Sequence, residues 1–311
     1  MSLWLILAAW VAAAVWPFTV EALRPRMNAA RRSTAPGDFA KLSKGLTHYR
    51  WLGAEDGPVA VCVHGLTTPS FVWGPVAEVL GRMGYRVLVY DLYGRGYSDR
   101  PKGAQDSDFF CAQLEELLAD QGVEGRFALF GYSMGGAIST AFAARHPERV
   151  QQLVLLAPAG LGHDLGPIAE MAVKYDLFGR WMTYAFYPKS LRRATESERG
   201  APSAIPNVVD LQIAETRLKG FTPAVLASLR GMLDKALEEE HRAIAAEGLP
   251  VLAIWGEDDE VIPLSCKEQL AEWNPEARQE VVPGAGHAVT YSHVEALAEI
   301  FERKLPGAKQ V

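Results

Sequence analysis

Cysteine is scarce in this chain, and its placement argues against both disulfides and metal binding. The 311 residues include three cysteines, Cys62, Cys111 and Cys266, which are widely separated and odd in number. No Cys-x-x-Cys or His-x-x-x-His spacing occurs that would suit a metal ion. We therefore expect three buried, unpaired thiols and no metal site.

Excess positive charge is also absent. The net charge is -6 at pH 7, and no basic tract is interleaved with aromatic residues. Nucleic-acid binding requires a basic face, so we expect no nucleic-acid partner. With 49% hydrophobic and 22% charged residues, the composition is that of a globular protein with a sizeable core, which excludes a disordered or fibrous chain. The oligomeric state is unknown from these data.

Charge of either sign is missing from residues 3–20. A helix of this length rises about 27 Å, close to the hydrocarbon thickness of a bilayer. Trp4 and Trp16 lie toward its ends, as interfacial aromatic residues do. Pro17 predicts an end or a kink of the helix. We expect a transmembrane helix here, followed by a juxtamembrane linker over residues 21–45.

The flanking charges indicate how this helix is oriented. Arginines follow the apolar run, at Arg24, Arg26, Arg31 and Arg32, whereas no Lys or Arg precedes it. The positive-inside rule then favours a single-pass anchor with the body of the protein in the cytoplasm. The alternative is a cleaved signal peptide with a secreted or periplasmic body, although a basic region before the run is missing. An amphipathic surface helix is less favoured, because the run is apolar all round.

Beyond residue 45, short apolar runs alternate with helical patterns. This alternation predicts an α/β fold with a mostly parallel central sheet and helices on both faces. Several runs are apolar throughout, as strands buried on two sides require. We predict strands over 47–52, 59–63, 86–91, 127–130, 152–156, 251–255 and 280–283, and helices near 75–83, 108–121, 135–146, 264–273 and 292–304.

The regular alternation stops between about residues 160 and 246. This segment has a helical pattern rich in apolar and aromatic residues and is punctuated by prolines. We interpret it as a helical cap inserted over the carboxyl edge of the sheet; additional core helices are the alternative. The predicted organisation is an anchor with its linker over 1–45 and an α/β domain over 46–311 that carries the cap.

A serine lies between two glycines where a predicted strand gives way to a predicted helix, in Gly131-Tyr132-Ser133-Met134-Gly135. A serine in so tight a turn has a strained backbone, and neighbours without side chains remove the clashes. Its hydroxyl then projects above the edge of the sheet, which is the geometry of a nucleophile elbow. The pattern alone is weak evidence, because a small-residue turn with a helix-capping serine has the same sequence features.

A base and an acid follow later strands, at the edge where an open α/β sheet places its ligands. His287 comes after the last strand in a glycine-containing loop, which leaves its imidazole free to move. Asp258 and Asp259 follow the strand over 251–255, and either could orient a histidine. We favour Asp259 from the spacing Gly-x-x-Asp-x-x-x-Pro. The candidate catalytic residues are therefore Ser133, Asp259 and His287, in the chain order of this fold.

The segment His64-Gly65-Leu66 supplies a candidate oxyanion hole. Gly65 lets the backbone turn closely after its strand, so that the Leu66 amide could point into the site. Together with the Met134 amide at the start of the next helix, it would stabilise a developing oxyanion. We interpret His64 as a residue that orients this loop, since it precedes the turn.

With these motifs the chain resembles the α/β-hydrolase superfamily, in its serine esterase and lipase branch, over about residues 47–305 with an interruption at the cap. The segment from Asp91 to Ser98 is similar to the superfamily's structural Asp-x-x-Gly-x-Gly-x-Ser loop. The resemblance implies Ser133 as nucleophile, His287 as base and acid, and Asp259 as its partner. Dehalogenase and epoxide-hydrolase relatives carry aspartate at the nucleophile position, which argues against both activities here.

The residues predict ester hydrolysis through an acyl-enzyme, with no cofactor. An apolar cap, a neighbouring anchor and no basic patch for a charged substrate favour a lipophilic ester such as monoacylglycerol or a (lyso)phospholipid. The arrangement resembles membrane-anchored monoacylglycerol-lipase-like hydrolases. A small-ester carboxylesterase or lactonase would carry the same motifs; a cofactor-free haloperoxidase or a non-catalytic ligand-binding receptor are further alternatives. Acyl length, head group and positional specificity depend on the shape of the pocket under the cap.

Overall fold

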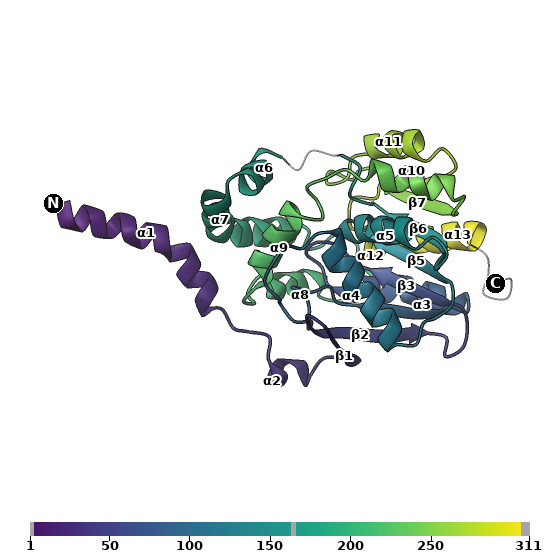
Figure 1. The fold of residues 1–311 in the computed structure, drawn as a ribbon, viewed down its shortest axis with the longest axis horizontal. Coiled ribbons are helices and arrows are strands. Elements are labelled where there is room, and N and C mark those ends of the chain that lie inside the picture. Colours follow the sequence, from purple (N-terminus) through teal and green to yellow (C-terminus); the bar gives the residue numbers. More distant parts are fainter. Residues whose placement is uncertain (1–2, 163–165, 306–311) are drawn as a thin grey trace.

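An eight-stranded sheet runs through the computed structural model, which describes residues 3–162 and 166–305 (Figure 1). Its strand order is β1-β2-β4-β3-β5-β6-β7-β8. The pairs β1–β2 and β2–β4 are antiparallel, and all other neighbours are parallel. The strands are β1 (Asp38–Leu42), β2 (Gly45–Gly53), β3 (Val59–Val63), β4 (Arg86–Tyr90), β5 (Phe127–Tyr132), β6 (Val150–Leu156), β7 (Val251–Gly256) and β8 (Arg278–Val282).

Neighbouring residues of each central strand point to opposite sides of the sheet. Both faces therefore carry apolar side chains, and helices cover both. On one face, Leu129 joins a cluster with side chains of α4, α5, α10 and α11. On the other, Phe130 joins a cluster with α3, α12 and α13 and meets Phe301 edge-to-face. These helices are α3 (Gly74–Arg82), α4 (Ser107–Asp120), α5 (Met134–Arg145), α10 (Glu238–Ala246), α11 (Ser265–Trp273), α12 (Val289–Ser292) and α13 (Val294–Lys304); a short 3-10 helix (Ser70–Trp73) precedes α3.

The predicted α/β class is confirmed, including the mostly parallel sheet. All seven predicted strands are present, with ends shifted by a few residues. The predicted anchor, cap and α/β domain each include residues outside the described ranges, namely 1–2, 163–165 and 306–311.

The predicted linker over 21–45 is wrong in its second half, because residues 38–42 form the edge strand β1. Only Ala40 of this strand is buried. A strand with so little burial does not need an alternation of apolar and polar residues, and its sequence shows none clearly. Antiparallel pairing with β2 in a hairpin stabilises the strand. The sheet therefore begins at Asp38, ahead of the predicted domain boundary at residue 46. A short helix, α2 (Ala29–Arg32), precedes it.

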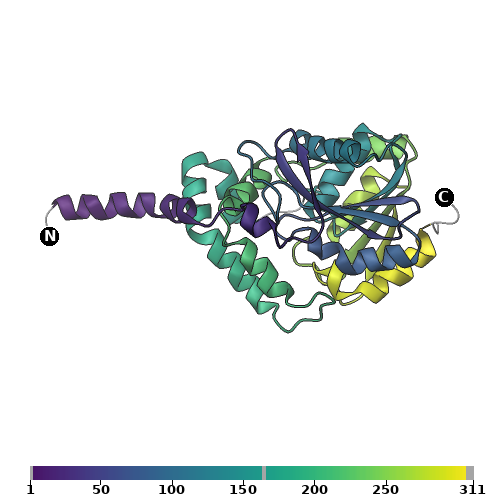
Figure 2. The ribbon, with the colours of Figure 1, turned by 90° about the horizontal axis from the view of Figure 1, so that it is seen from below.

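The apolar amino-terminal run forms α1 (Leu3–Leu23), the one helix in the described residues that is long and apolar enough to cross a membrane. A signal sequence passes the same test of length and composition. The helix continues through Pro17 to Leu23, so Pro17 does not end it, and Figure 1 shows a bend along its length. Figures 1 and 2 both show α1 extending away from the sheet.

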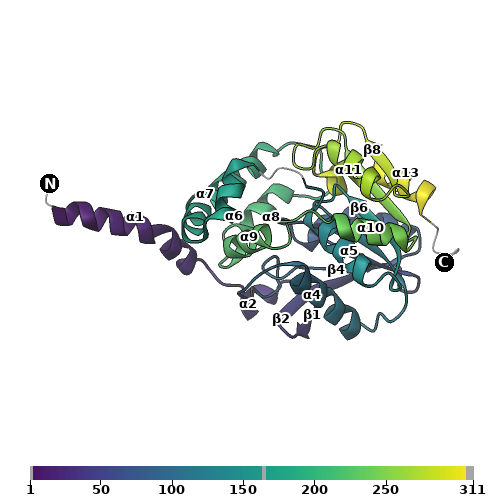
Figure 3. The ribbon, with the colours of Figure 1, turned by 45° about the horizontal axis from the view of Figure 1, so that its top comes forward.

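Four helices occupy most of the predicted cap: α6 (Pro167–Lys174), α7 (Asp176–Ser197), α8 (Val208–Glu215) and α9 (Phe221–Arg230). They lie between α1 and the sheet in Figures 1 and 3. Gln212 of α8 donates to Thr68, in the segment after β3, and the Ala204 amide donates to Tyr291, in α12 after β8. These contacts put α8 and the segment before it over the carboxyl ends of the strands. Phe221, Val225 and Leu229 of α9 form a small apolar core with α6 and α7.

The end of the predicted cap differs from expectation. Residues 238–246 form α10, which packs against α5 and α11 in the layer that covers the sheet (Figure 3). Ile244 is fully buried in the main core, which explains why this helix lies there. The cap therefore ends before Glu238.

Glu215, at the end of α8, ties the cap to the loop after β4. Its carboxylate accepts a hydrogen bond from the Gly96 amide at 2.9 Å and lies 3.7 Å from the Arg100 guanidinium. Burial raises the pKa of Glu215 from 4.5 to about 7. Between these two pH values the folded state holds more protons than the unfolded state. Stability from the protonated group is therefore present below pH 4.5 and is lost as pH rises through about 7.

Glu215→Gln should remove this part of the pH dependence. Where the folded state binds one more proton than the unfolded state, the free energy of unfolding falls by about 1.4 kcal/mol for each unit that the pH rises. We expect the wild-type thermal midpoint to fall as pH rises from 4.5 to 7, and the midpoint of Glu215→Gln to change less. Glu55→Gln, at an exposed carboxylate, is the matched control and should behave as the wild type. An identical pH profile for Glu215→Gln and wild type would contradict this account.

Candidate active site

Ser133 occupies a strained turn between β5 and α5. Its backbone has φ 54° and ψ −123°, a region that residues other than glycine rarely adopt. Backbone hydrogen bonds hold it there: the Ser133 amide donates to the Leu156 carbonyl at 3.0 Å, and its own carbonyl accepts from the Gly136 amide at 2.8 Å and the Ala159 amide at 3.0 Å. The turn is thus fixed by β6 and the loop that follows it.

Two glycines of the predicted motif are required by close backbone approach. A Cβ on Gly135 would overlap the Val63 carbonyl oxygen at the end of β3. A Cβ on Gly131 would lie 2.6 Å from the Gly136 Cα, inside normal contact distance. Both positions therefore need glycine for steric reasons, since α5 packs directly against its own strand and its neighbour.

The structure brings Ser133, His287 and Asp259 together from the ends of β5, β8 and β7. The Ser133 Oγ lies 3.0 Å from His287 Nε2, and His287 Nδ1 lies 2.8 Å from Asp259 Oδ2. Tyr132 donates its hydroxyl hydrogen to the His287 carbonyl at 2.9 Å, and its ring packs against the imidazole. The histidine loop is thereby held against the strand that carries the serine.

Asp259, and not Asp258, is the partner of the histidine. Asp259 is 6% exposed, whereas the Asp258 side chain points to solvent. One Asp259 oxygen accepts from the amides of Val261 and Ile262, each at 2.8 Å, which leaves the other oxygen for His287. These amides fix the position of the carboxylate. The choice that the sequence left open is therefore made by the turn after β7.

The loop after β3 lies beside the serine, as the predicted oxyanion hole requires. A Cβ on Gly65 would lie 3.1 Å from the Ser133 Cβ and 3.5 Å from its Oγ. Met134 begins α5 directly after Ser133. Within the described residues, neither the Leu66 amide nor the Met134 amide has a hydrogen-bond acceptor. Both remain available to an oxygen bound at Ser133.

His64 orients this loop, which confirms its predicted role. The residue is fully buried; its Nδ1 donates to the Gly65 carbonyl at 2.8 Å, and its Nε2 accepts from the Leu92 amide at 2.9 Å. Burial lowers the pKa of His64 to about 4, so the ring is neutral at pH 7. It does not contact Ser133 as a base.

Arg95 is a positioning residue that the sequence reasoning missed. Its side chain is fully buried, has no carboxylate partner within residues 3–162 and 166–305, and donates from Nε to the Leu66 carbonyl at 2.9 Å. The remaining nitrogens donate to Gln105 at 2.7 Å and to Ser228 of α9 at 2.8 Å. Arg95 therefore connects the loop after β3 to the cap. Its place in the Asp-x-x-Gly-x-Gly-x-Ser loop is the only sequence signal for it.

The three cysteines are free and buried, as expected. Burial raises the pKa of Cys111 to about 12 and that of Cys266 to about 11, so neither is a thiolate at pH 7. Across residues 3–162 and 166–305, no three His, Cys, Asp or Glu side chains are arranged to hold a metal ion.

The chain belongs to the family described as alpha/beta hydrolase fold, whose sequence model matches residues 58–294. Among curated relatives, the chain is 30% identical over 250 residues to pimeloyl-[acyl-carrier protein] methyl ester esterase of Nitrosomonas europaea, covering 79% of this chain and 95% of that protein. It is 27% identical to Lipase 3 of Moraxella sp. strain TA144, covering 82% of this chain and 79% of the lipase.

A solved structure shares the fold. The esterase EaEST from Exiguobacterium antarcticum superposes with a TM-score of 0.70 at 22% sequence identity, covering 86% of this chain and 98% of the esterase. At that identity the likeness shows the fold alone.

Gly135→Ala should destabilise the protein, because its Cβ would overlap the Val63 carbonyl and nothing flexible can yield. Overpacking of this kind costs about 1–3 kcal/mol. We expect a clear fall in the thermal unfolding midpoint. Gly125→Ala is the matched control: its Cβ would meet nothing within 4 Å, and its midpoint should stay near that of the wild type. Equal midpoints for the two variants would show that the elbow does not need glycine here.

Proposed function

We propose that this protein is a serine hydrolase that cleaves carboxylic esters through an acyl-enzyme. The observation that carries the proposal is the hydrogen-bonded chain from Ser133 through His287 to Asp259, with distances of 3.0 and 2.8 Å. An isolated serine is a weak nucleophile, and an adjacent base held by a carboxylate activates it. The esterase and lipase relatives are consistent with this chemistry.

In the first half of the reaction, Ser133 Oγ attacks the carbonyl carbon of the ester. Its proton passes to His287 Nε2, and Asp259 stabilises the imidazolium that forms. The carbonyl oxygen becomes an oxyanion, which accepts hydrogen bonds from the Leu66 and Met134 amides. One such donor is typically worth about 3 kcal/mol in the transition state. The tetrahedral intermediate then expels the alcohol, which takes the proton back from His287.

In the second half, water cleaves the acyl-enzyme. His287 Nε2 accepts a proton from water as its oxygen attacks the acyl carbon, and the same two amides stabilise the second oxyanion. Collapse breaks the bond to Ser133 Oγ, which regains a proton from His287. The products are a carboxylic acid and an alcohol, and no cofactor enters either half.

We propose a lipophilic ester as the substrate, such as monoacylglycerol or a (lyso)phospholipid. Leu66 packs against the apolar core of the cap, formed by Phe221, Val225 and Leu229. An acyl chain that extends from Ser133 would therefore contact apolar side chains of the cap. The neighbouring α1 supports a substrate that partitions into a bilayer.

We further propose that α1 anchors the protein in a membrane, with the catalytic domain on the cytoplasmic side. Along α1 only Pro17 and Glu21 are buried, so the protein body leaves its apolar surface uncovered. Arg24 and Arg26 follow the helix directly, which supports a cytoplasmic position for its carboxyl end.

A fluorophosphonate probe should label Ser133 in the folded protein, because the probe reacts with activated serines. Peptide mass spectrometry should locate the adduct on Ser133. Ser133→Ala should give no adduct, whereas Ser139→Ala, a buried serine on the following helix, should label as the wild type. Absence of any Ser133 adduct on folded wild type would refute the hydrolase and favour a ligand-binding receptor.

Hydrolysis should become faster as the acyl chain lengthens. Each buried methylene is worth about 0.8 kcal/mol, roughly a fourfold change. We therefore expect kcat/KM for p-nitrophenyl octanoate to exceed that for the acetate by at least about tenfold, and monoacylglycerol to be hydrolysed. The common leaving group is the internal control. A preference for the acetate or for a lactone would overturn the lipid assignment and leave the serine mechanism intact.

A further inference from the structure

A cavity of about 920 Å³ lies where α1 meets the cap, and we call it the anchor cavity. Its walls come from the end of α1 and the residues after it, the segment 99–105, α7, and the region from Lys219 to Gly231. Helix α9 separates it from the candidate active site: Val225 and Leu229 pack with Leu66, whereas Leu226 and Ala227 line the cavity. The anchor cavity is thus distinct from the Ser133 site.

The lining of the anchor cavity is strongly basic. It contains six cationic side chains and two carboxylates, Glu21 and Asp99. Both carboxylates are already paired: Glu21 binds Arg24 and accepts from the Gly220 amide, and Asp99 binds Arg32 and accepts from the Leu46 amide. The cations are Arg26, Arg100, Lys102, Arg180, Lys219 and Arg230.

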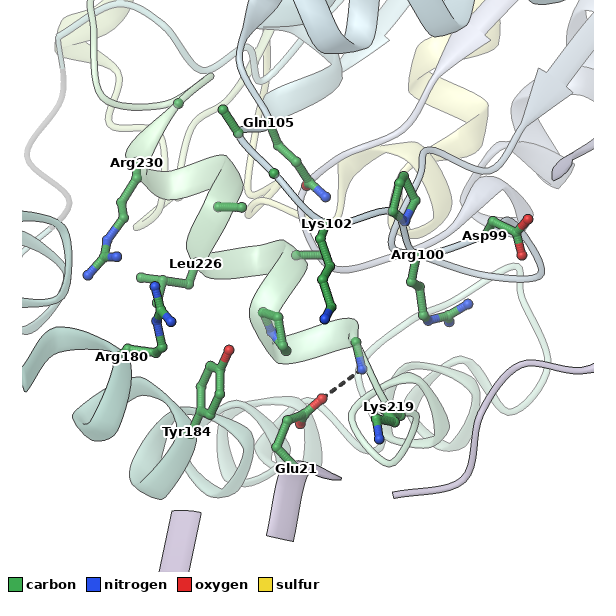
Figure 4. A pocket seen from close by; sticks show the side chains of 18 of the residues that line it. Glu21, Asp99, Arg100, Lys102, Gln105, Arg180, Tyr184, Lys219, Leu226 and Arg230 are labelled. Atoms are coloured by element: carbon green, nitrogen blue, oxygen red, sulfur yellow. Dashed lines mark hydrogen bonds between the residues drawn. The ribbon is translucent and has the colours of Figure 1, made fainter. Parts of the chain in front are cut away.

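Several of these cations lack a full complement of partners. In the described part of the chain, neither Arg26 nor Lys102 has a carboxylate partner, and the Arg100 Nε has no acceptor. Arg180 shares its carboxylate partner, Asp176, with Arg230, which also donates to the carbonyls of Ala172 and Tyr175. Figure 4 shows Lys102 extending into the cavity, with Arg180 and Tyr184 of α7 across from it. The cavity is therefore suited to an anion.

No local pattern in the sequence marks this site. The cations come from separate segments that only the fold brings together, so no basic tract marks them. The residues after α1 are fixed to the cap, because the Lys219 amide donates to the Pro25 carbonyl and Arg24 donates to Thr222.

Contacts along α1 place the cavity next to its apolar surface. Trp181 of α7 donates to the Ala13 carbonyl at 3.1 Å, and Tyr184 packs edge-to-face on Phe18. Apolar side chains of α7 remain exposed nearby, with Leu177 71% and Phe178 52% accessible. With α1 in a bilayer, Leu177 and Phe178 would contact lipid, and the cavity, whose lining begins at Glu21 near the end of α1, would lie toward the head groups.

We propose that the anchor cavity binds a phosphate group, supplied by an anionic phospholipid head group. The guanidinium and ammonium groups would contact phosphate oxygens, and Leu226 and Met27 would contact the adjoining carbon chain. A free phosphate ester carries the same chemistry and is the other source to be distinguished. The inference requires α1 beside a membrane for the lipid source, and it does not depend on the Ser133 chemistry.

Native mass spectrometry of the full-length chain in neutral detergent tests the site. Ser133→Ala serves as the background, so that no lipid is hydrolysed, and phosphatidylglycerol and phosphatidylcholine are titrated separately. We expect phosphatidylglycerol to bind at least about tenfold more tightly. Adding Lys102→Glu and Arg180→Glu, both at exposed side chains, should reduce this preference to about twofold or less. Lys41→Glu with Lys235→Glu makes the same charge change elsewhere and should retain it.

A second arm replaces the lipid by soluble glycerol phosphate. If the lipid binds more tightly and the cavity variant loses it, the head group is the ligand. If glycerol phosphate binds as tightly and is lost in the same variant, the phosphate site stands and its source is a soluble ester. Equal affinity of the cavity variant and its control for both ligands would overturn the proposal. Fluorophosphonate labelling of Ser133, in the same charge variants made with Ser133 intact, reports separately on the proposed hydrolase.

Discussion

The strained backbone of Ser133 is the constraint on which the candidate site depends. A non-glycine residue at φ 54° costs about 1–3 kcal/mol, which the surrounding structure must offset. It does so through hydrogen bonds from the turn to Leu156, Gly136 and Ala159, and through α5 packing closely against the end of β3. Without this turn, the serine hydroxyl would not project toward His287.

The parallel sheet supplies the rest of the geometry. Strands β3, β5, β7 and β8 end at one edge, so residues far apart in sequence meet there. Arg95 links this edge to the cap by binding the Leu66 carbonyl and Ser228 at once. The cap in turn holds α1 through α7. A continuous set of contacts therefore runs from the apolar amino-terminal helix to the candidate oxyanion loop.

Much of this arrangement could be predicted from the sequence, because its signals are local. Apolar strands, glycines beside Ser133 and the order of Ser133, Asp259 and His287 follow from short-range patterns. Other features have no local signature. The edge strand β1 buries one residue only, and the cations of the anchor cavity come from separate segments. Tertiary packing decides each of these.

Acid quenching during ester turnover, followed by peptide mass spectrometry, tests the central claim most directly. The elbow is proposed to make the Ser133 Oγ the atom that accepts the acyl group, with His287 as its base. We expect the acyl mass on the peptide that contains Ser133, and no acylated peptide or turnover in Ser133→Ala. An acyl group found on another side chain, or turnover at the wild-type rate in Ser133→Ala, would contradict it.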